Sequence, residues 1–366
     1  MPQLALSGLS KSFKSGKVLD AVSLEADKGE IVVVFGPSGT GKTVLLRLIA
    51  GVEDPDAGTI MLEGRDVTDA APEHRGIGMA FQNFALFPHM SAFDNIASAL
   101  TARRTAPAVI RAKVEAVAKL LKIGHVLQHQ PRELSNGQKQ RTALARALVA
   151  DPHILLLDDP LRNVDAKLRY EMRLELPALL KAAGSTVLYV TQDYKEAMAL
   201  GDRIAVLLEG RFVQVATPAD IYREPVSLGV ARLFGDPTIN LIPVEPAAAE
   251  TGPVVVVGTR SLPLPAGFAH AAGRKAVLGL RPEAIAVIDL PTADSFPVEV
   301  VAVTPLNEKT VLLLRTTDGR EILASEAGTD EAPRRHGPAH ARFDGAAVLL
   351  FDAQSGERIP LQPRQG

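Results

Sequence analysis

Short apolar runs alternate with amphipathic segments from Leu4 to about Phe234. The runs whose length and β-branched content predict strands are residues 31–35, 78–81, 154–158, 186–190 and 203–208. The segments between them that predict helices are residues 42–50, 108–122, 138–149, 166–183 and 194–200. Strands that alternate with helices in this order predict an α/β unit, in which helices cover a parallel sheet.

The hydrophobic pattern changes after about Gly235. Stretches rich in proline and alanine there separate short β-branched runs, which are residues 254–257, 298–303 and 311–315. The pair Asp318-Gly319 follows the last run and is typical of a β-hairpin turn. The sequence therefore predicts two domains, an α/β domain over residues 1–235 and a small all-β domain over residues 236–366.

Composition agrees with two folded domains and narrows the range of functions. The chain has 366 residues, which at roughly 150 residues a domain corresponds to about two domains. It has no cysteine, so disulfides and thiolate metal sites are excluded. Lys and Arg number 40 against 42 Asp and Glu, a balance that favours neither a nucleic-acid partner nor a membrane-surface protein. Because the apolar runs are strand-sized and the N-terminal sequence lacks a signal-peptide pattern, we expect neither a transmembrane helix nor export.

A glycine-rich segment between the first apolar strand and the first helix fits the pattern GxxxxGK[ST], as Gly36-Pro37-Ser38-Gly39-Thr40-Gly41-Lys42-Thr43. Its backbone N–H groups would hold phosphate oxygens, and the residues expected to form this cradle are Gly36, Ser38, Gly39 and Gly41. Lys42 would neutralise the β- and γ-phosphates, and Thr43 would place its hydroxyl on Mg²⁺. The alternative, an ordinary glycine-rich turn, is disfavoured by the strand-to-helix context.

Two carboxylates, Asp158 and Asp159, end a second apolar strand, where open α/β sheets place their ligands. We expect Asp158 to be a Mg²⁺ ligand through water, because Mg²⁺ tends to retain several waters in proteins. Alone, such a pair is more typical of a solvated turn. Its combination with the phosphate loop favours a site that binds phosphate groups and Mg²⁺.

A third motif, Leu134-Ser135-Asn136-Gly137-Gln138, precedes another predicted helix. Ser135 and Gln138 have the spacing of a capping box, so the simplest interpretation is a helix start. A helix N-terminus beside a glycine can also bind an anion, which leaves a second phosphate contact open.

Together these motifs resemble those of the ATP-binding cassette (ABC) ATPases, specifically the ATPase subunits of bacterial binding-protein-dependent importers. Besides the phosphate loop, the resemblance is carried by the signature residues Ser135, Asn136, Gly137 and Gln138, the Q-loop residue Gln82, the D-loop Asn163-Val164-Asp165, the adenine-stacking position Phe13 and the switch segment Thr191-Gln192-Asp193. The family implies a P-loop NTPase fold, with a RecA-like core and a helical subdomain at about residues 90–150. It also implies that Gln82 contacts the metal and takes part in catalysis, and that Asp165 belongs to the nucleotide site.

The resemblance extends into the second domain. Residues 234–241, 280–283 and 350–356 look like the linker and the C-terminal OB-like (TOBE) domain of maltose- and glycerol-phosphate-type importers. This implies import of a sugar, a polyol or a glycerol-type solute by a peripheral subunit at the cytoplasmic face of the inner membrane. The implied partners are a second ABC ATPase subunit, two membrane permeases that dock near residues 82–95 and, indirectly, a periplasmic or extracellular solute-binding protein.

Three positions depart from the family pattern. Asp159 stands where the family has the glutamate that acts as general base, and Gln192 stands where it has a histidine. A carboxylate withdrawn by one methylene and an amide that cannot become cationic both predict slow hydrolysis. Asn136 replaces the first signature glycine, and because Asn tolerates left-handed backbone geometry better than most residues, we expect contact with the partner's ATP to survive.

These departures favour a nucleotide-binding subunit that hydrolyses ATP poorly and pairs with a standard cassette in a heterodimer. Two alternatives stay open, a homodimeric slow ATPase of such an importer and a nucleotide-binding structural or regulatory subunit. A soluble DNA-repair or translation ATPase is disfavoured by the single cassette and by the importer-type second domain.

Overall fold

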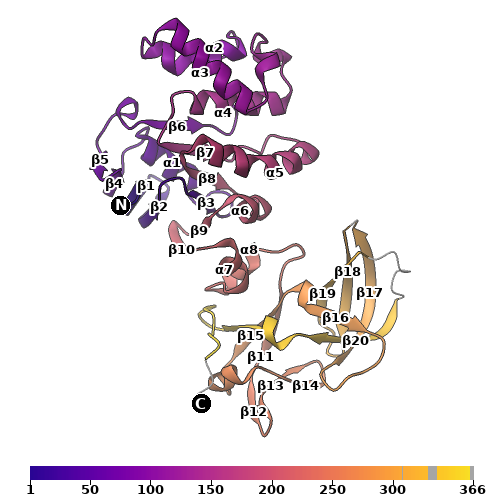
Figure 1. The fold of residues 1–366 in the computed structure, drawn as a ribbon. Coiled ribbons are helices and arrows are strands. Elements are labelled where there is room, and N and C mark those ends of the chain that lie inside the picture. Colours follow the sequence, from indigo (N-terminus) through magenta and orange to yellow (C-terminus); the bar gives the residue numbers. More distant parts are fainter. Residues whose placement is uncertain (307, 329–335, 363–366) are drawn as a thin grey trace. The chain divides into compact units, whose positions relative to one another are not determined.

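The computed structural model describes residues 1–306, 308–328 and 336–362 (Figure 1). Its contacts divide the chain into two compact units, Met1–Ala219 and Asp220–Gly366. Each unit has its own hydrophobic core. The cavity formed by the phosphate loop lies in the first unit.

The larger sheet of the first unit has the strand order β10-β9-β3-β8-β7-β6. Its strands are β3 (Ile31–Phe35), β6 (Ile77–Ala80), β7 (Ile154–Asp158), β8 (Thr186–Thr191), β9 (Arg203–Leu208) and β10 (Arg211–Ala216). All neighbouring strands run parallel except the pair β9 and β10. Every residue of β3, β7 and β8 is buried, as expected for a parallel sheet covered on both faces.

A second, antiparallel sheet has the order β2-β1-β4-β5. Its strands are β1 (Leu4–Phe13), β2 (Gly16–Ala26), β4 (Ala57–Leu62) and β5 (Arg65–Asp66). Helix α1 (Lys42–Ala50) packs between the two sheets, because its buried side chains share one core cluster with side chains of both. The helix that begins in the phosphate loop is therefore held on both sides.

Helices α2 (Ala92–Ala102), α3 (Pro107–Leu120) and α4 (Asn136–Leu148) form an arm between β6 and β7 (Figure 1). Helices α5 (Ala166–Ala183) and α6 (Tyr194–Leu200) follow β7 and β8. Short 3-10 turns are formed by Pro72–His74, Gly124–Val126 and Pro131–Glu133. Because β3, β6, β7 and β8 are parallel, the loops that follow them meet at one edge of the sheet, where open α/β sheets bind ligands.

The second unit begins within helix α7 (Pro218–Arg223), continues through α8 (Leu228–Leu233) and then consists of antiparallel strands. The strand orders are β11-β15-β21, β12-β13-β14 and β16-β20-β17-β18-β19. The strands are β11 (Asn240–Val244), β12 (Ala247–Ala249), β13 (Gly252–Val257), β14 (Arg260–Pro263), β15 (Ala276–Leu280), β16 (Ile285–Ile288), β17 (Phe296–Leu306), β18 (Lys309–Thr316), β19 (Glu321–Ala327), β20 (Gly337–Phe343) and β21 (Leu349–Asp352). Short 3-10 turns are formed by Ala266–Ala271, Pro282–Ala284 and Gly345–Ala347.

A buried arginine ties the two short helices to the strands of the second unit. The guanidinium of Arg281 donates hydrogen bonds to the backbone oxygens of Tyr222 and Phe234 and stacks at 3.6 Å from the centroid of the Tyr222 ring. These contacts explain why residues 220–235, which the sequence pattern assigns to the first domain, are grouped with the β-strands.

The strands and helices that the hydrophobic pattern predicts in the first unit are confirmed, with ends displaced by at most two residues. In the second unit the three predicted β-branched runs lie in β13, β17 and β18, and Asp318-Gly319 lies in the turn between β18 and β19. In the described part of the chain, no helix combines the length and the apolar character needed to cross a bilayer.

Candidate functional site

The phosphate loop, residues 36–43, connects β3 to α1, and close packing restricts it to glycine at two positions. A Cβ on Gly36 would lie 2.3 Å from the carbonyl oxygen of Leu207, so a side chain there would collide with neighbouring backbone. Gly41 precedes α1 with φ at 99°, in the left-handed region that favours glycine. The loop can therefore bring its backbone close to a ligand at the start of α1.

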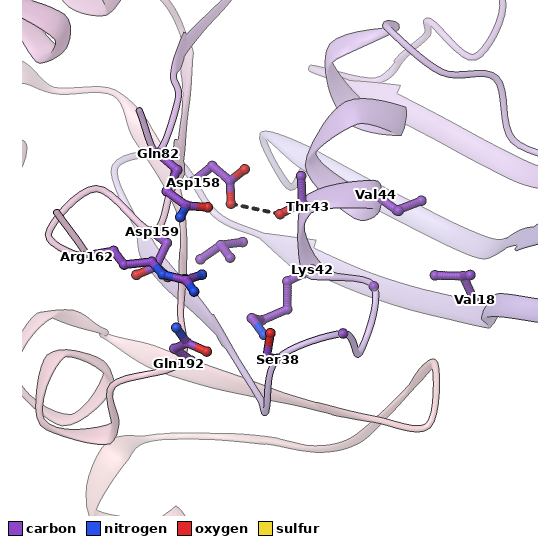
Figure 2. A pocket seen from close by; sticks show the side chains of 13 residues that line it. Val18, Ser38, Lys42, Thr43, Val44, Gln82, Asp158, Asp159, Arg162 and Gln192 are labelled. Atoms are coloured by element: carbon purple, nitrogen blue, oxygen red, sulfur yellow. Dashed lines mark hydrogen bonds and ion pairs between the residues drawn. The ribbon is translucent and has the colours of Figure 1, made fainter. Parts of the chain in front are cut away.

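The loop borders a cavity of about 210 Å³ (Figure 2). Ser38, Gly39, Gly41, Lys42 and Thr43 line one part of it. Gln82, Asp159 and Gln192, from the segments that follow β6, β7 and β8, line the same cavity (Figure 2). The structure thus brings together residues far apart in the sequence around one space at the edge of the sheet.

Lys42 is buried, and its side chain folds back onto the phosphate loop. Its Nζ donates hydrogen bonds to the carbonyl oxygens of Gly36, at 2.8 Å, and Pro37, at 2.6 Å. Burial lowers the pKa of Lys42, while the nearby charges of Asp159 and Asp158 raise it. The two carbonyl partners of the buried ammonium group are neutral. An anionic ligand in the cavity would therefore be a better partner for it.

Thr43 and Asp158 form a polar pair that joins α1 to the end of β7. The Thr43 hydroxyl donates a hydrogen bond of 3.1 Å to Asp158 Oδ1 (Figure 2). Burial raises the pKa of Asp158, against the hydrogen bond from Thr43 and the charge of Arg47. A hydroxyl and a carboxylate oxygen at this distance fit Mg²⁺, which prefers oxygen ligands from one or two side chains and keeps several waters.

Asp159 is the residue after Asp158, and its backbone conformation directs its side chain towards the cavity. Its φ is 44°, and its N–H donates a hydrogen bond of 2.9 Å to Val190 O of the neighbouring strand. Only 8% of Asp159 is exposed, and this burial raises its pKa to about 6, although the positive charge of Arg162 acts in the opposite direction. A carboxyl with a raised pKa in a cavity is suited to exchange a proton with a bound water.

Gln82 and Gln192 reach the cavity from the loops that follow β6 and β8. The backbone oxygen of Gln82 accepts a hydrogen bond of 2.9 Å from Asn163 Nδ2. Gln192 lies between two anchored neighbours, because the Thr191 hydroxyl accepts a bond from the N–H of Asp193, which in turn caps helix α6. Both amides are thereby placed where they can contact a ligand in the cavity.

A buried carboxyl group fixes the segment that carries Gln192. Glu196 Oε2 accepts hydrogen bonds of 2.9 Å from the hydroxyls of Tyr189 and Thr191. Burial raises the pKa of Glu196 to about 7, although these two hydrogen bonds lower it. Sequence analysis did not single out Glu196, because its partners belong to the preceding strand and only the fold brings them together.

The predicted signature, D-loop and adenine positions do not line this cavity. Ser135 caps α4, and together with Gln138 it forms the predicted capping box. Gly137 is buried in the first turn of α4. Asp165 caps α5 by accepting a hydrogen bond from the N–H of Leu168. Their assignment to the nucleotide site remains a prediction.

The reason given for tolerating Asn136 does not apply, while its contact with a partner's ATP remains a prediction. Asn136 is the first residue of α4, and its backbone is not left-handed. The tolerance of Asn for left-handed geometry is therefore not what allows it here; an exposed position in the first helical turn accepts a side chain.

Phe13 ends β1 as an exposed aromatic residue. Its side chain is 42% exposed, and Lys11 Nζ lies 5.5 Å from the centroid of its ring. An exposed ring can stack on a planar ligand. That role for Phe13 remains a prediction.

Arg162 is a cavity residue that sequence analysis missed. Its Nη1 lies 3.7 Å from Asp159 Oδ2. The one signal in the sequence was a basic residue three positions after an acidic motif. That spacing is also typical of a solvated turn.

We predict that Glu196 makes the stability of the first unit depend on pH. The pKa of Glu196 in the folded protein, about 7, exceeds the ordinary value of 4.5. Glu196 therefore stabilises the fold fully below pH 4.5, and this stabilisation is lost as the pH rises through about 7. The variant Glu196→Gln should remove this dependence. The difference in free energy of unfolding between wild type and variant should change by about 2 kcal/mol between about pH 5 and pH 8, in favour of the variant at high pH.

Urea denaturation at the two pH values measures this difference. Glu171→Gln, an exposed change on α5, should keep the pH dependence of the wild type. Parallel pH profiles for wild type and Glu196→Gln would contradict the prediction.

Comparison with known proteins agrees with this arrangement. The sequence matches the ABC transporter family over residues 19–162 and the TOBE domain over residues 278–351. A protein from Cereibacter sphaeroides named sn-glycerol-3-phosphate import ATP-binding protein UgpC is 40% identical, over 98% of this chain and 100% of its own length. The protein of the same name from Cupriavidus pinatubonensis is 38% identical, over 98% of this chain and 100% of its own length. A protein of the same name from a Ruegeria species is 44% identical over 98% of this chain and 99% of its own length. The chain therefore belongs to the ABC transporter family, in the branch of carbohydrate and polyol importer ATPases that carry a TOBE domain.

Proposed function

We propose that this chain is the ATP-binding subunit that energises a binding-protein-dependent importer of sn-glycerol-3-phosphate or of a related polyol or sugar. The observation that carries the proposal is the single cavity in which the phosphate loop, the Thr43–Asp158 pair and Asp159 meet. The solute is inferred from the names of the relatives. As part of such an importer, the chain would sit peripherally at the cytoplasmic face of the membrane.

The residues of the cavity fit ATP and Mg²⁺. The loop N–H groups and Lys42 Nζ would bind phosphate oxygens, with Nζ exchanging its two carbonyl partners for them. Thr43 and Asp158, with Gln82, would hold the metal. Mg²⁺ bound there would draw negative charge from the β- and γ-phosphate oxygens. Phe13 would stack on the adenine, and Ser135, Gly137 and Gln138 would contact the nucleotide of a partner cassette.

The same cavity supports slow hydrolysis. Asp159 would take a proton from an attacking water, but its side chain is one methylene shorter than the glutamate of the family pattern. A displacement of about 1 Å from the productive geometry can lower a rate on the order of 100-fold. Gln192 can donate a hydrogen bond to a phosphate oxygen but cannot carry a proton. The site would bind nucleotide well and turn it over poorly.

A subunit with a weak site of its own needs a competent partner. We therefore propose a heterodimer with a second ABC ATPase whose site has the standard glutamate and histidine. In the head-to-tail arrangement of the family, the altered signature with Asn136 would serve the partner's ATP. Asn136 is exposed at the start of α4, where it can reach a second chain.

The segment over residues 82–95 supports docking of a membrane permease. Asn95 is fully buried, accepts a hydrogen bond from the N–H of Phe87 and donates to the carbonyls of Phe87, Met90 and Ser91. Arg146 Nη1 donates to the backbone oxygen of Ala85 at 2.7 Å. The backbone is thus held from inside, while 42% of Phe87 stays exposed. A rigid segment with an exposed aromatic ring suits a protein interface.

We predict that restoring both family residues raises ATP turnover. The double variant Asp159→Glu with Gln192→His lengthens the base and adds a group that can become cationic. In the assembled transporter, phosphate release should rise by up to about 2-fold, because the partner's standard site already turns over, and it should rise more than with either single change.

The matched control is Asp151→Glu with Gln128→His, the same chemical changes at exposed positions away from the cavity. It should leave turnover unchanged. Ordinary cassette rates from the purified wild-type chain alone would contradict the proposal of a weakened site.

We also predict that two different ATPases copurify with the transporter. Affinity purification of this chain from native membranes, followed by mass spectrometry, should yield two permeases and a second cassette with glutamate and histidine at the corresponding positions. Recovery of this chain alone with the permeases would favour the homodimeric slow ATPase.

A further inference from the structure

Arg162 and Lys42 bring two positive charges to one small cavity. Both line the 210 Å³ space at the edge of the sheet, Lys42 from the phosphate loop and Arg162 from the turn after β7 (Figure 2). They are close enough that the charge of Arg162 helps to lower the pKa of Lys42, after the larger effect of burial. Asp158 and Asp159 line the same cavity, but an anion that enters it would still be attracted by both cations.

The backbone of Arg162 is anchored. Its N–H donates a hydrogen bond of 3.2 Å to the carbonyl oxygen of Asp159, and its own carbonyl accepts one of 3.3 Å from Arg169. Asp159 is in turn bonded to the backbone of β8. The Cα of Arg162 is therefore fixed relative to the strand ends.

The guanidinium of Arg162 is held much less firmly. Its closest approach to Asp159 is 3.7 Å, beyond hydrogen-bonding distance, and 47% of the side chain is exposed. An ion pair of this length and exposure contributes little to stability. The guanidinium can therefore exchange Asp159 for a stronger anion that enters the cavity.

We propose that Arg162 is a nucleotide-binding residue whose guanidinium binds the terminal phosphate of ATP and distinguishes ATP from ADP. A guanidinium forms paired hydrogen bonds with phosphate oxygens and keeps its charge at every physiological pH. It thereby supplies the positive charge that Gln192 cannot. Because a guanidinium does not release a proton, it stabilises bound ATP without relaying protons during hydrolysis.

This inference rests on the proposed function, since it places Arg162 in the ATP site. It differs from a role in which Arg162 acts only through Asp159. In that second role, Arg162 would orient the carboxyl and leave nucleotide affinity to Lys42 and the loop. Removing Asp159 separates the two roles, because a direct phosphate contact persists in its absence.

The test is isothermal titration calorimetry of the full chain with ADP and with the non-hydrolysable β,γ-imido analogue of ATP, each with Mg²⁺. Arg162→Ala should weaken the analogue about 10-fold or more, as expected when a hydrogen-bonded charge pair is lost, and should leave ADP affinity unchanged. Arg162→Lys should recover part of the loss, because it keeps the charge without the paired geometry. Arg111→Ala, an exposed change on α3, is the matched control and should affect neither ligand.

The same substitution in an Asp159→Asn background identifies the contact. There, Arg162→Ala should still weaken the analogue selectively. Equal loss for ADP and the analogue, no loss for either, or a loss that disappears in the Asp159→Asn background would each overturn the role of Arg162. A wild-type chain that binds neither nucleotide would instead overturn the proposed function itself.

Discussion

The structure depends on the burial of helix α1 between two sheets. Leu45, Leu46, Leu48 and Ile49 are fully buried against strands of both sheets, so the helix cannot shift without opening the core. Its first residues are Lys42 and Thr43, and its N-terminus opens on the cavity. Burial of an apolar helix therefore fixes two polar side chains and a row of backbone N–H groups at the place where a phosphate would bind.

The same burial gives the cavity its electrostatics. Lys42, Asp158 and Asp159 are each less than one-tenth exposed, and desolvation shifts the pKa of each group towards its neutral form. Such pKa shifts are typical of functional sites, where buried ionisable groups interact with a bound ligand. A nucleotide with Mg²⁺ would supply an anionic partner for Lys42 and a cationic partner for Asp158. In our account, Arg162 adds a second positive charge for the terminal phosphate. ATP hydrolysis is slow because Asp159 and Gln192 affect proton transfer rather than nucleotide binding.

Functional residues within contiguous motifs were predictable from the sequence. Residues whose contacts depend on the tertiary structure were not. The phosphate loop and Asp158 could be assigned because their chemistry lies within a few residues of a strand end. The cavity positions of Gln82 and Gln192 followed from the resemblance to the family. Arg162 could not be placed, because the left-handed φ of Asp159 and a backbone hydrogen bond decide where its side chain goes. Glu196 was missed because its two hydroxyl partners come from the neighbouring strand.

The central claim is that the site of this chain holds ATP without hydrolysing it at ordinary rates. Photo-crosslinking in the assembled transporter tests it most directly, with azido-ATP radiolabelled either in the α- or in the γ-phosphate. After the transporter has turned over, our account predicts that this chain carries both labels in equal amounts, because its nucleotide is still the triphosphate. Retention of the α-label with loss of the γ-label from this chain would contradict the account.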